Sequence, residues 1–183
     1  MIIDKDVFTS NEKEFVRKNI LSEIFPWYFI PNSVVTQRSG GDGVNFFGHT
    51  LVKRFEHRKL GEELHQSSAC DFFMPIIDRF FKKHKLKYKE ILRGSINLLY
   101  PQPVRQSAPH VDHNFPHNQI ICYLNESDGD TVVLKKEKGK RLKYKEFARV
   151  SPEPFKILYF GYLPHYVIHP TSGRRIVLVM TFK

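Results

Sequence analysis

Three histidines and one aspartate fall within eight positions in residues 110–125, HVDHNFPHNQIICYLN, directly before an apolar stretch that reads as a strand. His110 and Asp112 are two residues apart, and on a strand such residues point to the same face. An imidazole and a carboxylate on one face can bind a single metal ion. They would supply two of the three ligands of the facial triad that holds non-haem iron. The pattern therefore predicts a metal site whose third ligand comes from a distant segment.

Residues 161–182, GYLPHYVIHPTSGRRIVLVMTF, offer His165 and His169 as candidates for that third ligand. They precede Arg174 and Arg175, which open an apolar terminal strand. An arginine inside a barrel requires an anionic partner, because an unpaired buried charge is costly. Its planar guanidinium suits a carboxylate. Two histidines, an aspartate and a nearby strand arginine together favour iron with a dicarboxylate cosubstrate.

This combination resembles the Fe(II)/2-oxoglutarate-dependent dioxygenases, and among them the prolyl-4-hydroxylase-like branch. In that family the HxD motif is followed further along the chain by H-x-x-x-P-x-x-x-G-x-R and a closing strand. Here Gly173 and Arg175 stand eight and ten residues after His165, as in the family, whereas Pro170 comes one place late. His169 lies too close to Arg175 for that spacing, so the resemblance selects His165.

Further pieces of the resemblance appear in the same order along residues 92–182, about half of the chain. A Tyr-Pro pair, at 100–101, precedes the HxD motif, and a Tyr-Leu-Asn sequence, at 123–125, ends the strand after it. The turn SDGDT at 127–131 is similar to the Gly-Gly-x-Thr turn of the family. The segment FKILYF, at 155–160, is similar to the strand that leads to the distal histidine.

The resemblance implies three Fe(II) ligands, His110, Asp112 and His165, and no catalytic residue beyond this metal site. It implies that Arg175 binds the distal carboxylate of 2-oxoglutarate. Tyr123 and Tyr100 would donate hydrogen bonds to the same cosubstrate, although each could instead be an ordinary core tyrosine. The implied reaction is the hydroxylation of a C–H bond by O2, with release of succinate and CO2 and with ascorbate as a supporting reductant.

The substrate is less clearly marked, because the sequence departs from the prolyl branch at two places. That branch often carries an arginine shortly after HxD, where this chain has Asn118 or Gln119, and a tryptophan in the last strand, where it has Thr181 or Phe182. A peptidyl proline remains the first expectation. The alternatives are another protein side chain, a nucleic acid, a small molecule, or a non-catalytic metal-binding β-barrel module.

Composition limits the class of protein. A length of 183 residues with 41% apolar residues suits a single globular domain, and no stretch is apolar enough to span a membrane. The acidic beginning lacks the apolar core of a signal peptide, and two cysteines are too few for a disulfide scaffold. A cytoplasmic location is therefore expected. The net charge of +10 is concentrated in residues 81–90 and 134–146, which predicts exposed basic faces and leaves nucleic acid open as a partner.

The pattern of elements predicts an α+β fold. A possible capping box at Thr9 and Glu12 begins one helix that runs to about Ile24, and a second helix spans about 68–84, with Pro75 as its kink or true start. From residue 92 onward short strands alternate with turns. The resemblance makes this core, residues 92–183, a double-stranded β-helix of the jelly-roll or cupin-like kind, with the N-terminal helices packed on its major sheet. Residues 1–91 would support this core within one domain, 1–183, and the glycine-rich residues 39–48 are a candidate lid.

Overall fold

The computed structural model describes residues 1–33, 35–36, 40–137 and 143–183, and three antiparallel β-sheets dominate this part of the chain. The large sheet has seven strands, in the order β1 (Ile2–Asp4), β10 (Ile157–Phe160), β7 (Asn118–Tyr123), β12 (Arg175–Phe182), β6 (Ile91–Leu99), β5 (Phe46–Val52) and β2 (Tyr28–Ile30). The small sheet has the order β11 (His165–Val167), β8 (Thr131–Lys136) and β9 (Tyr144–Val150). A separate pair consists of β3 (Val35–Thr36) and β4 (Gly40–Gly41).

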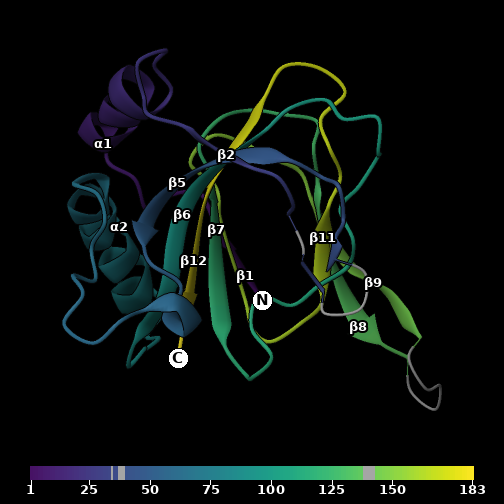
Figure 1. Ribbon diagram of the computed structural model, residues 1–183. Coiled ribbons are helices and arrows are strands. Elements are labelled where there is room, and N and C mark those ends of the chain that lie inside the picture. The colour runs from purple at the N-terminus through teal and green to yellow at the C-terminus, as the bar shows by residue number, and fades with distance from the viewer. Residues whose placement is uncertain (34, 37–39, 138–142) are drawn as a thin grey trace.

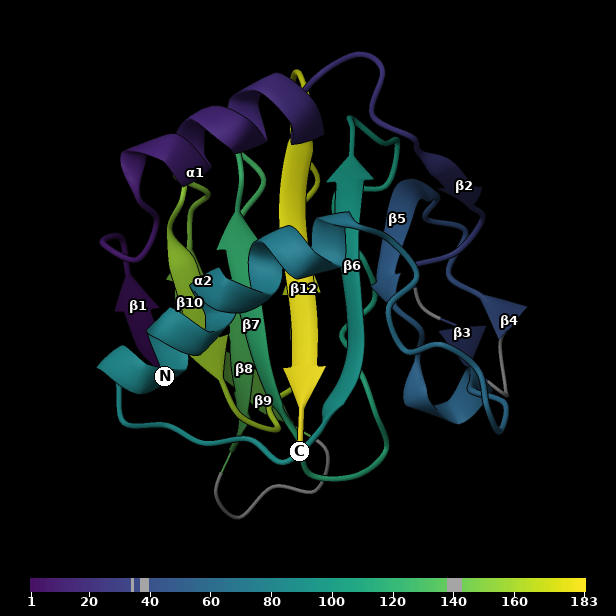
Figure 2. The same ribbon diagram turned by 90° about the vertical axis from the view of Figure 1, so that its left-hand side faces the viewer.

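The molecule has three layers. The helices α1 (Ser10–Phe15) and α2 (Ala69–Lys83) lie across the outer face of the large sheet, and the small sheet lies on the opposite side (Figures 1 and 2). Two facing antiparallel sheets with helices on the outside of the larger one form a double-stranded β-helix, or jelly roll. This arrangement confirms the predicted α+β class and the packing of the N-terminal helices on the major sheet.

Strand β12 shows why both faces of the large sheet are buried. Its residues Ile176, Leu178 and Met180 belong to the apolar cluster beneath the helices. Val177 and Val179 belong to a second cluster between the two sheets. Because side chains alternate across a strand, a strand covered on both sides becomes a continuous apolar run, as the terminal segment of the chain is.

Helix α2 presents one apolar face to the sheet. Its buried side chains include Phe73, Ile76, Ile77 and Phe80, and each such side chain contributes about 1.5–3 kcal/mol when it is removed from water. The bounds of α2 agree with the predicted helix. The helix continues on both sides of Pro75, so the expectation that this residue could mark its true start was wrong.

Helix α1 begins as the sequence predicts and ends earlier. Thr9 and Glu12 form the capping box, in which each side chain accepts a hydrogen bond from the backbone N–H of the other residue. A π-helix (Val16–Ile20) follows directly and ends the helical region before Ile24, which is 91% exposed. Glu12 also accepts two hydrogen bonds of 2.8 Å from the guanidinium of Arg79 on α2. One carboxylate thus caps the beginning of the first helix and connects this helix to the second.

The first half of the chain is less helical than predicted. Three strands of the large sheet, β1, β2 and β5, come from it, so this half of the chain extends the large sheet as well as supplying the helices. The glycine-rich segment that was predicted as a loop includes β4 and the beginning of β5, while Ser39 lies outside the described residues. Within the basic run 134–146, the described residues belong largely to strands β8 and β9, and residues 138–142 are not described.

Two observations bear on the compartment and chemistry of the chain. None of the helices in the described ranges is both long and apolar enough to cross a membrane. The two cysteines, Cys70 and Cys122, are both buried and unpaired with each other. Cys70 lies on α2 and Cys122 on β7, and both pack in the cluster beneath the helices.

The link between Glu12 and Arg79 predicts a pH dependence of stability. The Arg79 hydrogen bonds lower the pKa of Glu12 to about 2, so the stabilisation is complete above its ordinary pKa of 4.5 and is lost as the pH falls toward 2. We expect Glu12→Gln to cost about 1 kcal/mol at pH 7, or about 2–4 °C in Tm, and this difference should shrink below pH 4.5. Thermal melts followed by circular dichroism from pH 2 to 8 measure it.

Glu14→Gln is the matched control on the same helix. Its carboxylate is half exposed and, among the described residues, pairs with the surface side chains of Arg17 and Lys18, and such pairs contribute little. Equal changes in Tm for the two variants would contradict a stabilising link between Glu12 and Arg79. So would a change in Tm for Glu12→Gln that does not vary with pH.

Candidate metal centre

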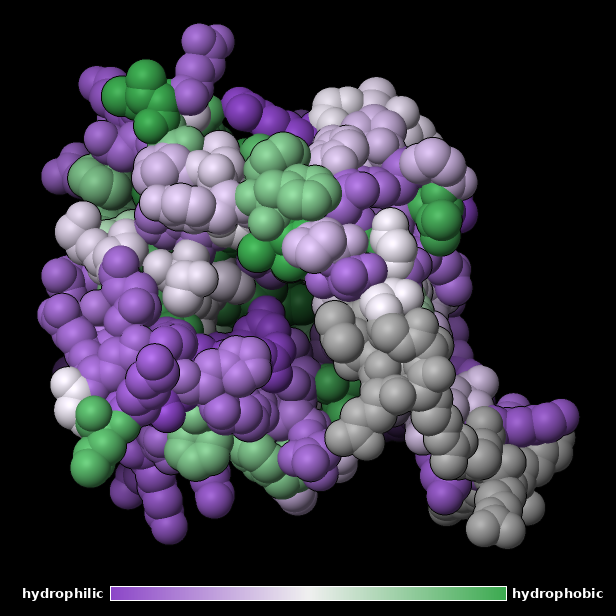
Figure 3. Space-filling view, viewed as in Figure 1, coloured by the Kyte–Doolittle hydropathy of each residue, from purple (hydrophilic) through white to green (hydrophobic). Residues whose placement is uncertain are grey.

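A cavity of about 650 Å³ lies between the large and small sheets. It is lined by one face of β5, β6 and β12, by β11, and by the segment that contains residues 107–112. Figure 3 shows it as a hollow near the middle of the molecular face, with hydrophilic residues beside it. His110, Asp112, His165 and Arg175 all line this cavity, so four residues that the sequence predicts for one site share one space.

A β-bridge brings the two histidines together. The N–H of His110 donates to the carbonyl of His165 at 3.0 Å, and the N–H of His165 donates to the carbonyl of His110 at 2.9 Å. The two ring centroids are 4.6 Å apart. Asp112 follows in a bend, with its Oδ2 atom 3.8 Å from Nε2 of His165. The three predicted ligands therefore converge.

The local backbone differs from the expectation that His110 and Asp112 share a strand. Only His110 is paired, and residues 112–115 bend away. The flanking Pro109 and Pro116 have no N–H to donate to a ladder, which limits strand pairing here to the single bridge. The bend, rather than strand alternation, turns Asp112 toward the cavity.

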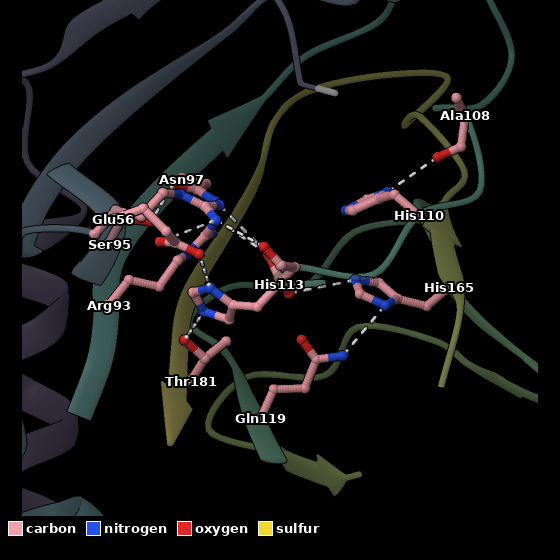
Figure 4. A network of polar contacts seen from close by, with 12 residues as sticks. Glu56, Arg93, Ser95, Asn97, Ala108, His110, His113, Gln119, His165 and Thr181 are labelled. Carbon is pink, nitrogen blue, oxygen red and sulfur yellow. Dashed lines mark hydrogen bonds and ion pairs between the residues drawn. The ribbon is translucent and has the colours of Figure 1, made fainter. Parts of the chain in front are cut away.

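Hydrogen bonds leave a metal-binding nitrogen on each histidine. Nδ1 of His110 donates to the carbonyl of Ala108 at 3.0 Å, so Nε2 keeps its lone pair (Figure 4). Nδ1 of His165 lies 3.3 Å from the carbonyl of Leu163, while Nε2 faces Asp112. Burial lowers the pKa of His165 to about 4, which keeps this imidazole neutral at physiological pH. Neutral imidazole is the form that binds metal.

The carboxylate of Asp112 is buried and only half satisfied. Arg93 lies 3.0 Å from Oδ1, whereas Oδ2 has no hydrogen-bond partner among the described residues. Burial alone would raise the pKa of Asp112, but Arg93, His165 and His110 outweigh it and hold that pKa well below its usual range. A buried anionic oxygen without a partner is costly, and a cation would satisfy it.

The donor set suits Fe(II), with two imidazole nitrogens and one carboxylate oxygen. Within the described ranges, no three His, Cys, Asp or Glu side chains are already closed around one point. Ligand atoms of a metal with bonds near 2.1 Å lie roughly 3 Å apart, compared with the 3.8 Å between Asp112 and His165. Nε2 of His165 and Oδ2 of Asp112 would move closer together on binding, and the donor types fit the ion.

Arg175 occupies a different part of the cavity wall and is 3% exposed. Its Nε donates to the carbonyl of Gly129 and its Nη2 to the hydroxyl of Thr131, both at 2.8 Å. Burial lowers the pKa of Arg175. These two contacts hold the guanidinium in place while none of the carboxylates in the described ranges forms an ion pair with it. The geometry leaves Arg175 available to an anion in the cavity.

The two predicted tyrosines do not line the cavity. Tyr123 is fully buried next to Arg175, and its hydroxyl donates to Thr131 at 2.8 Å. Tyr100 donates its hydroxyl to the side chain of Asn45. Their roles toward a cosubstrate therefore stay predictions. Sequence reasoning gave no role to Thr131, which lines the cavity and accepts hydrogen bonds from both Arg175 and Tyr123.

No protein-family model matches this sequence. No curated protein matches it either. Solved structures do match, including an oxidoreductase of the 2OG-Fe(II) oxygenase family from Burkholderia pseudomallei, with a TM-score of 0.65 and 14% identity over 99% of this chain and 84% of that one. The fold is that of the 2OG-Fe(II) oxygenases.

Two further structures share this fold. A prolyl hydroxylase from Trichoplax adhaerens, in complex with a peptide fragment of the hypoxia-inducible factor oxygen degradation domain, has a TM-score of 0.63 and 13% identity, covering 99% of this chain and 82% of that one. The non-haem alpha-ketoglutarate-dependent epimerase SnoN from nogalamycin biosynthesis has a TM-score of 0.61 and 11% identity, covering 99% and 77%. At these identities the likeness establishes the fold alone.

A buried glutamine completes the surroundings of His165. The side-chain nitrogen of Gln119 lies 3.2 Å from Nδ1 of His165, while Oε1 of Gln119 has no partner among the described residues. With the hydrogen on Nδ1, exchanging the amide oxygen and nitrogen of Gln119 would place an acceptor opposite this donor. Gln119 would then accept from Nδ1 and hold Nε2 ready for the metal.

We expect Gln119→Leu to weaken Mn(II) binding about 10- to 100-fold, since partners of ligating histidines typically have effects of that size. Calorimetric titration with Mn(II) measures the affinity. Gln102→Leu is the matched control, because Gln102 bonds to Asn45 away from the ligands. Equal affinities for the wild type and Gln119→Leu would show that Gln119 does not orient His165.

Proposed function

We propose that this protein is a 2-oxoglutarate-dependent Fe(II) dioxygenase that hydroxylates a C–H bond and releases succinate and CO2. The observation that carries the proposal is the arrangement within one cavity. Two histidines and a carboxylate with an unsatisfied oxygen lie together, and a buried arginine that forms no ion pair among the described residues lines the same space. A metal-binding module without this chemistry would not require the arginine.

Each of these residues has a role in the proposal. His110, Asp112 and His165 would hold Fe(II) through Nε2, Oδ2 and Nε2. Arg175, with the hydroxyl of Thr131, would bind the distal carboxylate of 2-oxoglutarate. When bound, the iron and the cosubstrate supply the oxidation of the substrate by O2. The chain itself contributes orientation and an apolar wall, formed in part by Val177 and Val179, which limits access of water.

For the substrate, we keep a peptidyl proline as the first candidate and another protein side chain as the second. The fold likeness to a prolyl hydroxylase that binds a peptide supports this choice. A small molecule or a nucleic acid is the alternative, supported by the likeness to the epimerase SnoN and by the net charge of +10 respectively. Ascorbate is proposed as a supporting reductant. The proposed compartment is the cytoplasm, where both buried cysteines would stay reduced.

The proposal predicts slow release of succinate from labelled 2-oxoglutarate when Fe(II) and ascorbate are added. Asp112→Ala removes a ligand and Arg175→Leu removes the carboxylate partner, so we expect each to reduce turnover by at least about 100-fold. Arg174→Leu is the control, since this neighbouring side chain is exposed and donates only to the carbonyl of Leu21. If no succinate forms and calorimetry detects neither Mn(II) nor 2-oxoglutarate binding, the proposal is wrong.

The same assay separates the substrate classes. Proline-rich peptides, oligonucleotides and small carboxylic acids are added in turn, and the class that stimulates succinate release contains the substrate. Stimulation by a proline-rich peptide that is lost when proline is replaced by alanine would identify a prolyl hydroxylase. Stimulation by an oligonucleotide alone would exclude it.

The close packing around Gly129 predicts that a substitution there would change 2-oxoglutarate binding. A Cβ at this position would lie 2.8 Å from the carbonyl oxygen of Ile168 and 2.9 Å from Cδ of Arg175, which is closer than real contacts allow. We expect Gly129→Ala to displace Arg175 and to weaken 2-oxoglutarate binding about 10-fold or more, since it disturbs a charged hydrogen-bonded contact. Calorimetry on the Mn(II)-loaded protein measures this. Gly161→Ala, whose nearest contact is 3.5 Å away, should leave the affinity unchanged.

A further inference from the structure

Two more arginines line the cavity near Asp112. Arg54 follows strand β5, and Arg93 lies on β6. Their side chains are 29% and 19% exposed. Figure 4 shows Arg93 on the strand that also carries Ser95 and Asn97, with the rings of His110 and His165 across from it. Both guanidinium groups thus face the space in which a substrate would approach the metal ligands.

Asp112 is the main ion-pair partner of both arginines. Nη1 of Arg93 lies 3.0 Å from Oδ1 of Asp112, and Nη2 of Arg54 lies 4.0 Å from the same oxygen. Nη1 of Arg54 donates to the backbone carbonyl of Asp112 at 2.6 Å. Glu56 is also 4.0 Å from Arg54, but its other oxygen binds Nδ1 of His113 at 2.7 Å. A guanidinium has five N–H donors, so most of the donors of this pair are not used by the described residues.

The charges of the cavity do not balance. Three arginines line it, and Asp112 is the only carboxylate among the lining residues that the structure describes. On the proposed function, a divalent iron and a dianionic 2-oxoglutarate cancel each other, which leaves a surplus of two positive charges. Cations that are largely shielded from water are costly in surplus unless an anion pairs with them.

The surplus lies away from the cosubstrate anchor. On strand β12, Arg175 is opposite Leu99 of β6, whereas Thr181 is opposite Arg93. Six residues along β6 therefore separate the two positions, or roughly 20 Å of strand. The distal carboxylate of 2-oxoglutarate, held by Arg175, would therefore lie away from the guanidinium groups at the other end of β6 and could not pair with them.

We propose that Arg54 and Arg93 form an anion-binding subsite for the substrate, and that the substrate carries a carboxylate or phosphate group close to the C–H bond that is hydroxylated. The planar guanidinium groups of the two arginines suit either anion, because a carboxylate and a phosphate each offer two oxygens to paired N–H donors. This inference rests on the proposed function for the position of the iron and 2-oxoglutarate. The subsite itself is built from residues of this chain.

The test uses the full chain loaded with Mn(II) and 2-oxoglutarate. Sulfate, as a phosphate analogue, and acetate are titrated at constant ionic strength and followed by calorimetry. We expect saturable binding of one or both, with Kd on the order of millimolar, and at least about a 10-fold loss of affinity in Arg54→Gln and Arg93→Gln. Preference for sulfate would indicate a phosphate-bearing substrate, and preference for acetate a carboxylate-bearing one. Both outcomes support the subsite.

Lys53→Gln is the matched control, since it removes a positive charge from the adjacent residue, which pairs with Glu62 and does not line the cavity. Equal losses in Lys53→Gln would indicate a general effect of charge and overturn the proposal. So would the absence of anion binding to wild-type protein that does bind Mn(II) and 2-oxoglutarate. If neither Mn(II) nor 2-oxoglutarate binds, the proposed function has failed instead. Arg93→Lys keeps the charge and serves as a second variant if Arg93→Gln does not fold.

Discussion

The site depends on a short antiparallel pairing between the segment before Asp112 and strand β11. His110 and His165 exchange two backbone hydrogen bonds, and the N–H of Ser107 donates to the carbonyl of Val167. In such a pairing, a slip of one residue turns a side chain to the opposite face. The register therefore determines that the two imidazole rings, 55 positions apart in the sequence, point into the same cavity.

The large sheet forms the wall of the cavity that faces this pairing. Its central strand β12 is buried on both faces, with helices on one side and the cavity and small sheet on the other. The same strand carries Arg175 at its first position and Thr181 near its last. Arg175 lines the cavity, whereas Thr181 is buried outside its lining, where its hydroxyl lies 2.8 Å from Nε2 of His113.

Sequence patterns correctly predicted those elements that depend on residues close together in the chain. The apolar face of α2, the capping box of Thr9 and Glu12, and the apolar runs of β7 and β12 follow from spacing within a few residues. The preference for His165 came from its distance to Arg175, and His169 is buried with its Nδ1 bonded to the carbonyl of Val104, outside the lining of the cavity.

Other parts of the site had no local signal. Arg54 reaches the carbonyl of Asp112 across 58 positions in sequence, and Gln119 reaches His165 across 46. Arg54 follows β5 of the large sheet, and Gln119 on β7 faces His165 on β11 of the small sheet, so both contacts form only when the fold brings distant segments together. The short strands β1 and β2, with three residues each, were missed because they are too short for an alternation pattern to be recognised.

The placement of the two cysteines has a consequence for redox chemistry. Burial raises the pKa of Cys70 to about 11 and raises that of Cys122 as well, so neither side chain has thiolate character. Oxidation of cysteine follows thiolate character and exposure. Mixtures of Fe(II), O2 and a reductant produce oxidants, and the folded chain offers them no reactive thiol. On the proposed function, these two side chains would therefore form neither disulfides nor sulfenic acids beside the iron.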